Sequence, residues 1–94
     1  MTSSREAFSK FDKWKNSRTV LNLTVETNGE IHKSQGAIFF TDEDEGIVGF
    51  VDDTSRNSVS LDLSGEVSFR LESRSVEVLC AGRGTVTFAE VLLV

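Results

Sequence analysis

His32 and Cys80 are the single histidine and the single cysteine of the chain, so any site that needs either residue type must use them. A zinc site combines several such ligands, and neither residue has a second one at ligand spacing. No serine lies in a Gly-x-Ser-x-Gly turn, the setting of the nucleophile in many hydrolases. We therefore predict no enzyme activity, no catalytic or metal-ligating residue and no cofactor, with His32 half-exposed on a strand and Cys80 in the core.

Acidic residues gather on two neighbouring polar segments. They are Asp42, Glu43, Asp44, Glu45, Asp52 and Asp53. Carboxylates are the ligands that calcium prefers, but the EF-hand pattern fails, because Gly46 stands fifth counted from Asp42 and no Glu stands twelfth. A solvated turn is the favoured interpretation, and cation binding is the alternative.

Arg83 lies between two glycines, Gly82 and Gly84. Successive backbone N–H groups in such a turn can form an anion-binding nest with the guanidinium beside it. A Gly-x-Gly turn between two strands also explains the pattern without any ligand.

Length and composition favour a single domain, residues 1–94, in a cytoplasmic protein. The chain has a hydrophobic fraction of 38% and a formal charge of -5. A lone cysteine favours a reducing compartment, and no window approaches the ~18 apolar residues of a membrane span. The acidic balance disfavours RNA as a partner, because phosphate binding draws on clustered Lys and Arg.

The elements that must position these residues begin with a helix within residues 1–17. Ser3 and Glu6 have the spacing of a capping box. The residues with helical spacing on one apolar face are Ala7, Phe8, Phe11 and Trp14. Lys13, Lys15 and Arg18 gather near the other end, where the helix dipole favours cations, and the helix is expected to stop near residue 16.

Residues 19–94 change to a period of two, which predicts an antiparallel β meander. Asn28-Gly29 predicts a two-residue hairpin in which Val25 faces His32, and Gly36 predicts a bend or bulge. The alternations 59–63 and 67–71, separated by Ser64-Gly65-Glu66, predict a second hairpin. The fold class is thus mainly β, with the N-terminal helix capping a strongly bent meander or small barrel of about 5–7 strands; an open sandwich is the alternative.

One family resemblance emerges from these segments. The residues that resemble the first motif of the Sm-like small-barrel family are Asn28, Gly29, Gly36, Ile38, Asp42 and Val48. The residues that resemble a shortened second motif of this family are Arg83, Gly84, Val86 and Phe88. In that family a helix precedes a bent barrel, and the residues at the positions of Asp42, Gly46, Arg83 and Gly84 line a ring that binds single-stranded RNA; here Gly46 replaces the family's Asn.

Two functional hypotheses follow. The first is a structural or interaction module without chemistry of its own that forms homo-oligomers. Its candidate interface is the apolar C-terminal run Val91, Leu92, Leu93 and Val94, which could be covered by the helix, by the first strand or by another copy. The second is an Sm-like protein that binds single-stranded RNA through Asp42, Gly46, Arg83 and Gly84, with phosphate contacts from Arg83 and the basic helix end.

Overall fold

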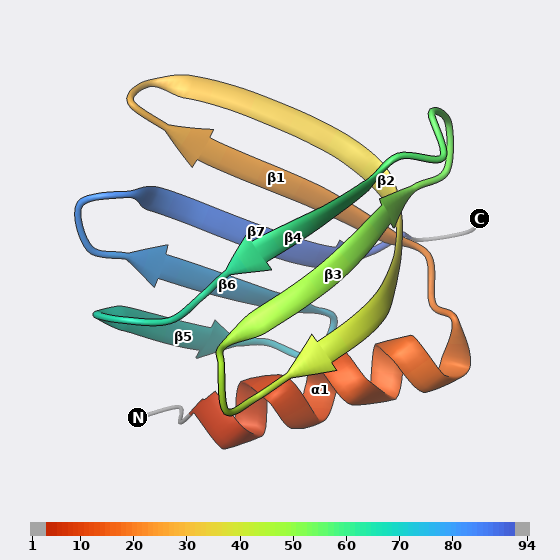
Figure 1. Ribbon diagram of the computed structural model, residues 1–94, viewed down its shortest axis with the longest axis horizontal. Coiled ribbons are helices and arrows are strands. Elements are labelled where there is room, and N and C mark those ends of the chain that lie inside the picture. The colour runs from red at the N-terminus through yellow and green to blue at the C-terminus, as the bar shows by residue number, and fades with distance from the viewer. Residues whose placement is uncertain (1–3, 92–94) are drawn as a thin grey trace.

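The computed structural model describes residues 4–91, which form one helix followed by seven strands. Their bounds are α1 (Ser4–Ser17), β1 (Leu21–Thr27), β2 (Glu30–Asp42), β3 (Ile47–Asp52), β4 (Ser58–Asp62), β5 (Val67–Leu71), β6 (Ser75–Cys80) and β7 (Gly84–Glu90). The prediction of a mainly β chain led by one helix is confirmed (Figure 1). Among these residues no helix has the length and apolar character needed to span a membrane.

Helix α1 buries the face that its sequence pattern predicts. Its buried residues are Ala7, Phe8, Phe11 and Trp14. The helix ends in a Schellman-type cap: Arg18 adopts φ 54°, its N–H donates to Lys15 O, and Thr19 N donates to Trp14 O at 3.0 Å. The helix end thus lies one residue beyond the predicted position. Ser3 of the expected capping box lies outside the described residues.

The first hairpin has the predicted register. Strands β1 and β2 pair with Thr27 opposite Glu30 and Val25 opposite His32. Asn28 (φ 50°) and Gly29 (φ 82°) both have positive φ, as a two-residue turn of this type requires.

The seven strands form one antiparallel sheet in the order β4-β3-β2-β1-β7-β6-β5, and the sheet is not closed. The predicted second hairpin is therefore wrong: β4 pairs with β3, β5 pairs with β6, and no ladder joins β4 to β5. The physical reason is that residues 63–66 connect the two ends of the sheet order. A tight turn at this point would instead have paired β5 with β4.

Strand β7 lies inside the sheet, between β1 and β6. Strand β7 pairs with the first strand without closing a barrel, and α1 packs on it through Phe11 and Phe88. Val91 N donates to Val20 O at 3.1 Å just past the end of β7. Val91 is half-buried, and Leu92, Leu93 and Val94 lie outside the described residues.

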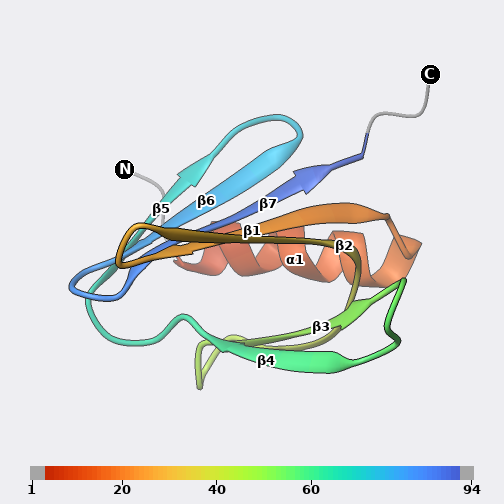
Figure 2. The same cartoon turned by 90° about the horizontal axis from the view of Figure 1, so that it is seen from above.

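Strand β2 bends the sheet into two arms that face each other, and α1 lies across the space between them (Figures 1 and 2). The β-bulge lies between Ile38 and Phe40, so of the bend or bulge predicted at Gly36 the bulge is wrong. Gly36 pairs with both Leu21 and Asp52 in regular register. A Cβ there would lie 1.9 Å from Val51 O, so glycine serves a close backbone approach.

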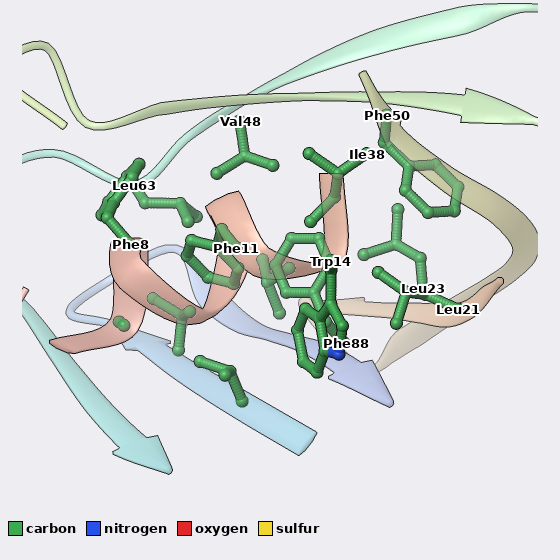
Figure 3. Close-up of a cluster of buried hydrophobic side chains, with 14 of the residues drawn as sticks. Phe8, Phe11, Trp14, Leu21, Leu23, Ile38, Val48, Phe50, Leu63 and Phe88 are labelled. Carbon is green, nitrogen blue, oxygen red and sulfur yellow. The ribbon is translucent and has the colours of Figure 1, made fainter. Parts of the chain in front are cut away.

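The core lies between the two arms and α1 (Figure 3). Phe11 packs against Phe8 in a T-shaped arrangement at 5.1 Å between ring centroids and against Phe88 at 4.9 Å. From the other arm, Val48 and Phe50 are fully buried. Edge-to-face and tilted ring pairs add to the free energy gained from apolar burial. Helix α1 is thus the element that joins the two arms.

Candidate functional site

Arg83 links the β6–β7 turn to the connection between β4 and β5. Its Nη1 donates to Asp62 O at 3.3 Å, and its Nη2 donates to Ser64 O. A guanidinium provides five N–H donors in a planar fork, which suits two neighbouring carbonyl oxygens. The guanidinium that would lie beside an anion-binding nest is thus partly occupied by the chain's own backbone.

Gly46 meets the same connection from the other side. Leu63 N donates to Gly46 O at 2.7 Å, and a Cβ at Gly46 would lie 3.0 Å from Ser64 N. The residue also has φ +71°, so its conformation and its surroundings both favour glycine. Gly46 and Arg83 therefore lie on two sides of one loop, residues 63–66.

Asp42 and Gly84 do not join them. Asp42 Oδ1 accepts a hydrogen bond from Glu45 N at 3.1 Å within its own turn. Gly84 (φ +111°) lies against β1, where a Cβ would be 2.0 Å from Glu26 O. Each of the four residues that the resemblance nominated thus has a structural role in a turn or a close approach.

Asp62, at the end of β4, is the polar residue that the sequence reasoning missed at this loop. Its Oδ1 accepts hydrogen bonds from the Ser64 hydroxyl and from Ser64 N, the latter at 2.9 Å. Together with the charge of Arg83 these bonds hold the pKa of the Asp62 carboxyl below its ordinary value. The Asp-x-Ser spacing was the available signal, because an aspartate often accepts a bond from the backbone two residues later.

The acidic residues do not converge on one point. Asp42 to Glu45 adjoin the start of β3, and Asp52 and Asp53 lie at its end. Asp52 Oδ1 accepts hydrogen bonds from Ser55 N at 2.9 Å and Thr54 N at 2.8 Å, which lower the pKa of that carboxyl. Within residues 4–91 no group of three or more His, Cys, Asp or Glu side chains could hold a metal ion.

His32 and Cys80 differ in exposure. The His32 side chain is 72% exposed, more than the half expected, and its Nε2 lies 3.5 Å from Glu30 Oε2. Cys80 is buried, as expected, opposite Val67 and Gly84 in the sheet. Neither arrangement provides an activated nucleophile with a base beside it.

A shallow open hollow of about 760 Å³ adjoins the β6–β7 turn. Its lining includes Asn28, Glu66, Leu79 and Arg83. In the part of the chain that the structure describes, no buried side-chain polar atom lacks a hydrogen-bond partner. Among the described residues that line it, the hollow therefore contains no buried side-chain polar atom that lacks a hydrogen-bond partner.

One lysine at the basic end of α1, Lys15, also has partners within the protein. Lys15 Nζ donates to Thr41 Oγ1 at 3.4 Å and lies 3.7 Å from Asp12 Oδ1. Thr41 Oγ1 also donates to Asp12 Oδ1, so these three side chains tie α1 to β2. An acidic residue inside the basic cluster reduces its attraction for phosphate.

Strands β4 and β5 end the sheet order, so among residues 4–91 each pairs with a neighbouring strand along one side only. Strand β4 ends the sheet order, and no other strand among residues 4–91 pairs along its side away from β3, here named the β4 edge (Figure 2). All residues of β4 except Leu61 are exposed. Unpaired backbone groups along a strand are a template for another strand.

No family model, curated protein or solved structure matches the chain. Inference about function therefore depends on the geometry described above, and the resemblance to Sm-like proteins stays an expectation from sequence.

Proposed function

We propose that this protein is a non-catalytic interaction module that associates with copies of itself. The single observation that carries the proposal is the β4 edge. Its five residues, Ser58–Asp62, include one charged side chain, Asp62 at the strand end, and no Lys or Pro, the residues that most commonly protect an exposed strand from pairing with another chain. Symmetric association of identical chains is the commonest way in which such surfaces are covered.

Exposed apolar side chains near this edge support the proposal. Val59 is 45% exposed although its register partner in β3, Phe50, is fully buried. On β2, which β3 separates from β4 in the sheet order, Phe39 is 53% exposed and Phe40 is 46% exposed. Exposed apolar side chains of this size favour association over a solitary chain.

Binding of single-stranded RNA is the weaker hypothesis. Arg83 donates to two backbone carbonyls, and Lys15 contacts Asp12 and Thr41, so two of the four candidate phosphate contacts already have partners. The formal charge of -5 adds a general repulsion toward phosphate.

Sedimentation equilibrium of the intact chain at tens of micromolar tests the proposal. We expect a mass above that of one chain, and a monomer under these conditions would contradict self-association. A variant with Leu92→Lys and Leu93→Lys distinguishes two candidate interfaces. It alters the C-terminal interface inferred from the sequence and leaves the β4 edge unchanged. Titration with short RNA at two salt concentrations tests the second hypothesis, since phosphate contacts weaken steeply as salt rises.

A further inference from the structure

The two ends of the sheet differ in what lies beside them. At the β5 end, Lys10 Nζ donates to Ser73 O at 2.6 Å immediately after the strand. Phe8 of α1 lines one hollow together with Val67 and Phe69 of β5. Helix α1 therefore accompanies the β5 edge, whereas the β4 edge has neither a helix nor a strand among the described residues (Figures 1 and 2).

The alternation of an antiparallel ladder identifies the backbone groups that face this edge. Asp52 N donates to Asn57 O at 2.9 Å before β4, and Leu63 N donates to Gly46 O at 2.7 Å after it. Hydrogen-bonded pairs occur at every second residue, so Val59 and Leu61 bond to β3. The N–H and C=O groups of Ser58, Ser60 and Asp62 therefore point away from β3.

The sequence of β4 is complementary to itself in antiparallel register about Ser60. In that register Ser60 faces Ser60 of the second copy, Val59 faces Leu61, and Ser58 faces Asp62. Apolar side chains thus meet on the inner face, and a hydroxyl donor meets a carboxylate on the outer face. No pair places like charges opposite each other.

Arg83 is compatible with this pairing. It donates to Asp62 O at the end of the β4 edge, and a carbonyl oxygen with two lone pairs can accept a second hydrogen bond. Among the described residues, no backbone hydrogen bond outside the strand ladders involves the N–H or C=O of Ser58 or Ser60. The pairing would also cover Val59, which accounts for an inward-facing valine that is 45% exposed.

We propose that the chain forms a two-fold symmetric dimer in which β4 pairs antiparallel with β4 of a second copy, centred on Ser60. This inference rests on the proposed self-association and specifies its surface and symmetry. In a head-to-tail chain of subunits, β4 of one copy would have to pair with β5 of the next, and α1 lies beside β5. An isologous interface uses one surface twice and closes at two copies.

Val59→Lys is the variant that tests the interface. It places a flexible charged side chain opposite Leu61 of the second copy, while the exposed position tolerates lysine in a single chain. Sedimentation equilibrium should show a dissociation constant raised at least about tenfold, with an unchanged circular dichroism spectrum. Ile31→Lys is the matched control: Ile31 is an apolar strand residue, 56% exposed on β2, and the lysine there should leave the dimer intact.

A disulfide tests the symmetry independently of Val59→Lys. In a Cys80→Ala background, Ser60→Cys provides one cysteine, and residues directly opposite in an antiparallel hydrogen-bonded pair have Cα atoms about 5.5 Å apart. That separation lies within the range of disulfides, so mild oxidation should yield a covalent dimer. Ser68→Cys on β5 in the same background should remain a single chain.

The outcomes separate this inference from the proposed function. A wild-type chain that is monomeric at tens of micromolar would overturn both. An oligomer that Val59→Lys leaves intact, or one in which Ser60→Cys does not cross-link, overturns the β4 dimer and leaves self-association through another surface. Should Val59→Lys fail to fold, the cross-link alone decides.

Discussion

At the scale of single residues, the loop between β4 and β5 shows polar side chains used for architecture. Arg83, Asp62 and Ser64 satisfy one another and the backbone across the gap between the sheet ends. Such groups resemble a binding site in composition. The two glycines beside Arg83 and the Sm-like resemblance nominated it for phosphate binding, but in the structure its donors are directed at the protein itself.

Asp62 makes the stability depend on pH in a defined direction. Its carboxyl has a lowered pKa in the folded state, caused first by the Ser64 hydroxyl, so the folded protein holds the charged form better than the unfolded chain does. The resulting stabilisation is present above the ordinary pKa of aspartate and is lost as the pH falls below about 4 through the lowered value. Asp62→Asn should therefore lower the free energy of unfolding at neutral pH, and its deficit should shrink in acid.

Urea denaturation from neutral pH to strong acid measures this difference. Asp53→Asn, which removes the same charge from an exposed loop, is the matched control. Equal deficits for both variants at every pH would show that net charge, and not the bonds of Ser64, causes the effect.

At the scale of elements, α1 connects the two arms of the sheet through a narrow set of contacts. Phe11 is fully buried and contacts rings of α1 and β7, and Trp14 Nε1 donates to Glu90 Oε2 at 2.9 Å. The helix therefore contributes to stability chiefly through its packing, since an isolated helix of this length is marginal in water.

Phe11→Ala should lower the free energy of unfolding by about 3–5 kcal/mol, the usual cost of a large buried ring and the cavity that it leaves. Urea denaturation followed by Trp14 fluorescence measures the change. Lys13→Ala on the same helix is the control, because Lys13 is exposed and should change stability by less than about 0.5 kcal/mol. A loss below about 1 kcal/mol for Phe11→Ala would show that α1 is dispensable for the core.

At the scale of the whole molecule, the sheet order predicts how protection is distributed. Strand β1 lies at the centre of the order with β2 and β7 on its two sides, and β4 and β5 lie at the ends. Amide hydrogen exchange should accordingly be slowest in β1, because central backbone groups open only in large unfolding events.

Exchange measured on the monomeric Val59→Lys variant provides the comparison. There the amides of Ser58 and Ser60 should exchange faster than those of Val59 and Leu61, because the first two point away from β3 and the other two bond to it. Protection of these two amides equal to that of β1 would contradict the assigned direction of the β4 backbone.

Local patterns in the sequence determined much of this protein. The helix, its buried face, the first hairpin and the antiparallel strands follow from periodicity and turn residues, which act over a few positions. The partners of distant strands do not follow from such signals, because pairing β1 with β7 depends on how the whole sheet bends. Only the tertiary structure separated β4 from β5, placed β7 inside the sheet and moved the bulge past Gly36. The tertiary structure also decided that β4 lies at an end of the sheet with one side unpaired. The reason is that a strand forms hydrogen bonds with whichever backbone the fold places beside it.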